Sequence, residues 1–113
     1  MLRQNRNHRI LKEIGYQREA VLEYAKRWAK GRNPRYLDFE HLGGDCTNFA
    51  SQCIYAGSGV MNYTPTMGWY YSSGSNRSPS WTGVVYLYNF LTGNKSAGPY
   101  GVETNEKGVE PGD

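Results

Sequence analysis

The sequence is poor in cysteine, histidine and long apolar runs, and each shortage excludes a class of protein. Only two cysteines and two histidines occur among 113 residues, and their spacing resembles no zinc site. No apolar run approaches the roughly 20 residues that a helix needs to cross a bilayer, which excludes a membrane span from this sequence. Charged residues make up only 20%, so a disordered segment kept open by its own charge is not expected. The length fits one small domain rather than a multidomain enzyme.

Aromatic residues are abundant and compensate for a modest hydrophobic content. The chain has 10 Tyr, 3 Trp and 3 Phe, although only 38% of its residues are hydrophobic and its mean hydropathy is −0.74. Each aromatic ring can bury roughly 150–250 Å². We therefore expect aromatic side chains to supply much of the apolar area that the fold buries.

The net positive charge is concentrated at the N-terminus. The formal net charge is +3, and residues 1–12 contain Arg3, Arg6, Arg9 and Lys12 with no acidic residue. A basic tail can contact nucleic acid, a membrane surface or an anionic wall polymer. Since few aromatics are interleaved with these charges, we predict a solvated extension over residues 1–15 and no specific nucleic-acid partner. The apolar stretch of about 7–15 residues that marks a signal peptide does not follow the charges, so localisation stays open.

Apolar spacing predicts three helices. Residues 17–30 carry the stripe of an amphipathic helix. A second helix is expected at residues 46–56, with Asp45 as its N-cap and Gly57 as its C-cap. A third helix is expected at about residues 82–91. Residues 57–80 predict a long ordered loop, since their Met, Trp and Tyr side chains would be costly to expose together, and residues 94–113 predict a loop with one short strand at about 101–103.

The second predicted helix has one apolar face, which we expect to be its buried face, and one polar face. On a helical wheel the apolar face holds Cys46, Phe49, Ala50, Cys53 and Ile54, and the polar remainder holds Thr47, Asn48, Ser51, Gln52 and Tyr55. The two cysteines would lie about 10.5 Å apart along the axis, beyond the roughly 7 Å that a disulfide allows between Cα atoms. Both are therefore predicted to be free thiols.

The string from Gly43 to Phe49 is the part of the sequence that points to chemistry. Cys46 would stand at the N-terminus of a helix, where negative charge is favoured, and the thiolate is the nucleophilic form of cysteine. Gly43 and Gly44 leave room for a substrate backbone, and the Cys46 N–H has no intrahelical acceptor and could face an oxyanion. The pattern suits acyl transfer, but it also fits a structural thiol, because free cysteine is among the most buried residue types.

Residues 43–53, Gly-Gly-Asp-Cys-Thr-Asn-Phe-Ala-Ser-Gln-Cys, resemble the nucleophile segment of the bacterial "putative amidase domain" family. These are papain-like cysteine hydrolases related to NlpC-type cell-wall peptidases. The likeness covers residues 16–113 and continues through five further segments: 62–65, 68–70, 78–82, 86–90 and 111–113. It implies an α+β papain-like fold in which Cys46, flanked by Gly44 and Asp45, forms a thioester during hydrolysis of an amide bond. The implied substrate is a peptide or peptidoglycan-like molecule, in an extracellular or cell-wall setting, and no cofactor or metal is implied.

The chain departs from the family pattern at its end. In this family Pro-Gly-Asp introduces the first strand of a small sheet, and the general-base histidine lies downstream, whereas this sequence stops at Asp113. The resemblance therefore implies the helical N-terminal part of the domain, mainly α with long loops and without the sheet half. We expect this chain to be weak or inactive alone, and its face toward the missing sheet could self-associate.

No residue within the chain is a natural substitute for the missing base. His41 precedes Cys46 by five residues, yet in papain-like sites the base approaches from the opposite lobe, and His8 lies in the basic tail. Asp38 or Glu40 could lie near the helix tip, but an ionised carboxylate would repel an oxyanion. Gln52 points about 240° away from Cys46 on the wheel at 100° per residue, which argues against a role at the same site.

Aromatic residues in the loops are candidates for substrate contact. Trp69, Tyr70 and Trp81 could stack on a sugar or line a peptide groove. The alternative is that they fill a core that is poor in Leu and Ile. A second function therefore stays open, that of a binding module with an aromatic groove and no turnover.

Overall fold

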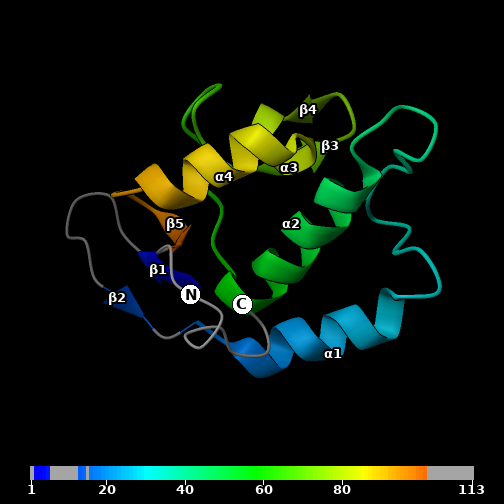
Figure 1. Ribbon diagram of the computed structural model, residues 1–113, viewed down its shortest axis with the longest axis horizontal. Coiled ribbons are helices and arrows are strands. Elements are labelled where there is room, and N and C mark those ends of the chain that lie inside the picture. Colours follow the sequence, from blue (N-terminus) through cyan, green and yellow to red (C-terminus); the bar gives the residue numbers. More distant parts are fainter. Residues whose placement is uncertain (1, 6–12, 15, 102–113) are drawn as a thin grey trace.

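The computed structural model describes residues 2–5, 13–14 and 16–101 (Figure 1). The helices are α1 (Arg18–Trp28), α2 (Asp45–Ser58), α3 (Pro79–Thr82) and α4 (Val84–Gly93). The strands are β1 (Leu2–Asn5), β2 (Glu13–Ile14), β3 (Tyr71–Ser73), β4 (Asn76–Arg77) and β5 (Gly98–Gly101). Helix α2 runs between α1 on one side and α3 and α4 on the other (Figure 1).

Residues from both ends of the described chain pair in one antiparallel sheet of order β2-β1-β5. Arg3 lies opposite Tyr100, and Gln4 lies opposite Pro99 on one side and Ile14 on the other. Residues 2–5 were predicted to lie in a solvated extension, but they are paired in this sheet, where β1 supplies hydrogen-bonding partners for the backbone of β5. The short strand expected at about residues 101–103 forms slightly earlier in the chain, and residues 102–113 lie outside the described part.

The predicted helices are present, with ends that differ for identifiable reasons. Helix α2 passes Gly57 and ends at the left-handed Gly59, whose N–H donates to Tyr55 O. Gly57 is buried instead at the contact with α1, where an added Cβ would lie 2.4 Å from Val21 Cγ2. The start of the third predicted helix is a separate helical turn, α3, and α4 begins after Gly83.

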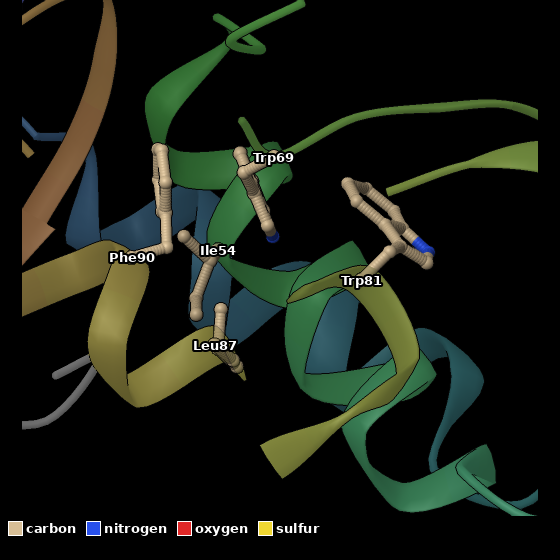
Figure 2. Packing of buried hydrophobic residues seen from close by; sticks show 5 residues of the cluster. All are labelled: Ile54, Trp69, Trp81, Leu87 and Phe90. Carbon is tan, nitrogen blue, oxygen red and sulfur yellow. The ribbon is translucent and has the colours of Figure 1, made fainter. Parts of the chain in front are cut away.

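Two tryptophans form the centre of the core. Trp69 and Trp81 are both 0% exposed, and their ring centroids lie 4.9 Å apart. They cluster with Ile54, Leu87 and Phe90 (Figure 2). Aromatic side chains thus supply much of the buried apolar area, as the composition predicts.

The polar face of α2 is buried against these tryptophans. Trp69 Nε1 donates to Ser51 Oγ at 3.1 Å, and Trp81 Nε1 donates to Asn48 Oδ1 at 3.0 Å. Ser51 Oγ in turn donates to Trp81 O at 3.0 Å. The prediction that only the apolar face of this helix is buried is wrong, because a buried indole N–H needs an acceptor.

The long loop between α2 and α3 is ordered, as predicted. A bridge joins Asn62 to Trp69, and the β3–β4 hairpin follows it. Buried hydroxyls fix this segment, since Ser80 Oγ donates to Gly68 O at 2.7 Å and Tyr70 N donates to Ser78 Oγ at 2.9 Å. The loop thereby holds Trp69 in the core.

One face of α4 is apolar and exposed. Val84, Val85 and Tyr88 keep 69%, 65% and 51% of their surface exposed. Self-association through an exposed apolar face stays a prediction. None of the helices in the described residues has both the length and the apolar character needed to span a membrane.

Candidate active site

Cys46 lies exposed in the first turn of α2. Two consecutive left-handed glycines, Gly43 at φ +81° and Gly44 at φ +84°, turn the chain into the helix. Gly44 also packs against the end of α3, because an added Cβ there would lie 2.5 Å from Thr82 O. The glycines therefore set the direction in which Cys46 leaves the turn.

The N-terminus of α2 has no side-chain cap. Asp45 was predicted to be the N-cap, but Gly44 takes that position and Asp45 is the first helical residue. The first helical hydrogen bond runs from Asn48 N to Gly44 O at 2.9 Å. The N–H groups before it, including that of Cys46, have no acceptor within the helix, so they are placed to stabilise a negative charge at this end.

The side chain of Asp45 is held by Arg32 instead. Arg32 Nη1 lies 2.9 Å from Asp45 Oδ1 and Arg32 Nη2 lies 3.0 Å from Asp45 Oδ2, which is a two-pronged contact. Arg32 also pairs with Asp38 at 3.1 Å and Glu40 at 3.3 Å, and Phe39 N donates to Asp45 Oδ1 at 3.2 Å. The guanidinium of Arg32 is the main cause that lowers the pKa of Asp45. The cluster ties the loop after α1 to the residue next to Cys46.

Cys46 opens onto a cleft of about 610 Å³ between the end of α1, the loop that follows it and the first turns of α2. Figure 1 shows that loop joining the two helices at one end of the molecule. The aromatic side chains in its wall are Trp28, Tyr36 and Phe49, and the neutral polar ones are Asn33, Asn48 and Gln52. The charged ones are Lys30, Arg32 and Asp45. This mixture of aromatic surface and amide groups suits a peptide-like ligand.

The predicted substrate-contact residues do not lie in this cleft. Trp69 and Trp81 are fully buried, so the alternative that they form the core holds and their proposed contact with substrate is wrong. Tyr70 is half-buried and packs against Tyr63, with ring centroids 5.6 Å apart. Helical spacing places Trp28 and Phe49 on apolar helix faces, and no role was predicted for Tyr36. Such spacing does not show that a helix end remains open.

Histidine does not contribute to the cleft in the described part of the chain. His41 is exposed on a turn, where Leu42 N donates to Phe39 O at 3.1 Å, and His8 lies outside the described residues. Asp38 and Glu40 do lie near the helix tip, but as partners of Arg32. Within the same residues, no group of three or more His, Cys, Asp or Glu side chains could hold a metal ion.

Gln52 lines the same cleft as Cys46. The helical wheel had placed its side chain away from the cysteine and therefore away from any shared site. A wheel compares directions around one axis only, whereas the cleft wraps around α2 because α1 and the loop form its other walls. The prediction that Gln52 and Cys46 do not share a site is therefore wrong, because both side chains line this cleft.

Cys53 is a free thiol, as predicted, and is buried. Burial raises its pKa to about 11, whereas an unfolded chain ionises this thiol from about pH 8.5. The neutral Cys53 thiol therefore makes its full contribution to the free energy of unfolding below about pH 8.5. This contribution is lost as the pH rises toward 11. We expect the free energy of unfolding to fall by about 2 kcal/mol between pH 8 and 10 for this reason.

Urea titrations at several pH values measure this loss, and Cys53→Ala is the matched variant. The variant should lose clearly less stability than the parent chain over the same interval. Equal slopes in the two proteins would show that Cys53 does not titrate in this way.

Comparison with known proteins places the chain in a family. The model of the "Putative amidase domain" family matches residues 15–113, close to the range in which the resemblance was seen. The uncharacterized protein YhbB of Bacillus subtilis (strain 168) is 35% identical over 101 residues, which cover 87% of this chain and 31% of that protein. The chain thus spans less than a third of this relative's length. No solved structure matches. The chain belongs to the putative amidase domain family, which is a family of amidase-like hydrolases.

Proposed function

We propose that Cys46 is the nucleophile of an amide-bond hydrolase that acts on peptides, including cell-wall peptide. The observation that carries this proposal is the exposed Cys46 at the uncapped N-terminus of α2, on the wall of a cleft. A papain-like arrangement, in which α2 is the helix that carries the nucleophile, belongs to the same proposal.

The proposed reaction has two steps. The Cys46 thiolate attacks the amide carbonyl, and the N–H groups at the start of α2 stabilise the negative charge that develops on its oxygen. The tetrahedral species then collapses to a thioester, and the leaving amine takes up a proton. Water attacks the thioester, releases the carboxylic acid and restores the thiol.

The proton transfers need a general acid–base group within about 2.6–3.2 Å of the reacting atoms. Since no histidine lines the cleft in the residues described, we infer that this group comes from outside them. A cleft without that group should still be acylated by an activated ester, whose leaving group needs no proton. It should hydrolyse an ordinary amide slowly, because a site without its base loses most of its rate advantage.

The test uses p-nitrophenyl acetate, which releases a coloured phenolate. We expect a burst of about one equivalent and an acetyl group on Cys46 in peptide mass spectra. Cys46→Ala should abolish both signals. Cys53→Ala is the matched control and should leave them intact, because the Cys53 thiol is buried.

An acetyl group on lysines alone, or a burst that survives in Cys46→Ala, would show that Cys46 is not the nucleophile. That result would favour the second function, a binding module that uses the aromatic cleft without turnover. Its supporting observation is the set of three aromatic side chains in the cleft wall, Trp28, Tyr36 and Phe49.

A further inference from the structure

Gln52 is a buried amide whose two ends differ in their surroundings. The residue is 6% exposed, yet it lines the cleft. Its Oε1 accepts a hydrogen bond from the Tyr24 hydroxyl, and Asn33 Nδ2 donates to the same hydroxyl at 3.2 Å. Among the described residues, no hydrogen bond is seen from Gln52 Nε2, and this atom is not one of the fully buried side-chain atoms that lack a partner, so it reaches solvent. The carbonyl end is thus fixed, and the donor end is left for the cleft.

The neighbouring amide of Asn48 provides the contrast. Asn48 is 2% exposed and also lines the cleft, but both of its ends are engaged. Its Nδ2 donates to Leu37 O at 3.3 Å, and its Oδ1 accepts from Trp81 Nε1 at 3.0 Å. Asn48 therefore has a structural role, because neither end of its amide is left for a ligand. Gln52 differs from it, because its Nε2 meets solvent in the cleft; a ligand that displaces this water must supply an acceptor in its place.

The tyrosine that orients Gln52 is suited to remain a donor. Burial is the main cause that raises the pKa of Tyr24, so its hydroxyl keeps its proton through the neutral range. While it does, Oε1 of Gln52 is occupied and Nε2 is directed away from Tyr24. The two hydrogen bonds, from Asn33 to Tyr24 and from Tyr24 to Gln52, thus hold the Nε2 donor of Gln52 in place.

The position of Gln52 decides what this donor can bind. It lies six residues after Cys46 on one helix, which is about 9 Å along the axis. An extended peptide covers that distance in about three residues. A donor so placed is too far along the helix for the carbonyl that Cys46 attacks, but it can reach a main-chain carbonyl further along the same substrate.

We propose that Gln52 forms a peptide subsite: its Nε2 donates to a main-chain carbonyl of the substrate about two to three residues from the bond that Cys46 attacks. This inference rests on the proposed function and adds to it that the substrate is an extended peptide rather than a small amide. Gln52 is a substrate-binding residue, and Tyr24 is a positioning residue that acts through it.

The experiment compares the rates at which three iodoacetyl reagents alkylate Cys46 in the whole chain. Iodoacetamide reports the reactivity of the thiol alone. Iodoacetyl-Ala-Ala-Ala-amide adds further carbonyls, and N-octyl iodoacetamide adds a chain without them. We expect the tripeptide reagent to react about two- to tenfold faster than the octyl reagent, the range for one added hydrogen bond.

Gln52→Glu is the main variant, because its carboxylate still accepts from Tyr24 but donates nothing at neutral pH. It should bring the ratio of tripeptide to octyl rates close to one, and this ratio cancels any change that the new charge makes in the reactivity of the thiol itself. Gln52→Met should give the same ratio, and it replaces the first variant if that one fails to fold. Tyr24→Phe should lower the ratio in part, and the exposed Tyr88→Phe should not change it.

A ratio of one in the parent chain, or a raised ratio that persists in both Gln52 variants, would overturn the subsite. A structural effect of Gln52 would instead slow all three reagents together, and that result also counts against the proposal. If Cys46 reacts with the tripeptide and octyl reagents as described but is not acetylated by p-nitrophenyl acetate, the subsite stands and the nucleophile assignment fails.

Discussion

Replacing Trp81 by alanine is expected to destabilise the protein by about 3–5 kcal/mol, the range for removing a buried tryptophan from a core. Trp81 is 0% exposed and packs with ring centroids 4.9 Å from Trp69 and 5.9 Å from Tyr36. The substitution also leaves Asn48 Oδ1 without the indole N–H that it accepts at 3.0 Å. A small domain is stable by only about 5–15 kcal/mol, so the variant should unfold at a much lower urea concentration.

Tyr86→Ala is the control, since this side chain is 61% exposed. Its loss should change the free energy of unfolding by no more than about 0.5 kcal/mol. Urea unfolding followed by circular dichroism measures both variants against the parent chain. If Trp81→Ala costs no more than Tyr86→Ala, the Trp69–Trp81 pair is not the centre of the core.

Gly44→Ala is expected to destabilise the protein and displace Cys46, whereas Gly43→Ala should do less of both. Both glycines have a left-handed φ, near +80°, which costs a residue with a Cβ roughly 1–2 kcal/mol. They differ in space, because a Cβ at Gly44 would lie 2.5 Å from Thr82 O while one at Gly43 would meet nothing within 4 Å. The excess cost of Gly44→Ala therefore reports the contact between the turn and α3.

Two measurements test this pair of variants. Urea unfolding should place Gly44→Ala below Gly43→Ala in stability, and the alkylation rate of Cys46 by iodoacetamide should change more in Gly44→Ala. Equal effects in the two variants would mean that backbone conformation alone matters and that the approach to Thr82 does not position the cysteine.

The existence of the main helices could be predicted because it depends on local spacing. Residues 17–30 have an amphipathic period, and the predicted helix differs from α1 by only one residue at its start and two at its end. The surroundings of α2 could not be predicted in the same way. Its polar residues looked solvent-facing until Trp69 and Trp81, distant in sequence, proved to need Ser51 and Asn48 as acceptors.

In the candidate site, too, the local features could be predicted and the contacts between distant residues could not. The place of Cys46 at the start of a helix follows from the glycines before it, and the structure has it there and exposed. The cleft could not be predicted, because it depends on how the loop after α1 folds back over α2. Arg32 meets Asp45 across thirteen positions, and Tyr24 meets Gln52 across twenty-eight, and no periodic pattern encodes such pairs.

The pairing of β1 with β5 has a consequence for how the chain is made. Residues 2–5 leave the ribosome before their partner, residues 98–101, and the four described helices are synthesised in between. The packing of α1 against α2 needs only residues 18–58, and contacts between sequence neighbours form fastest. A nascent chain should therefore acquire its helical pair and the surroundings of Cys46 early. Until β5 arrives, β1 keeps an unpaired edge that a chaperone or another nascent chain could occupy.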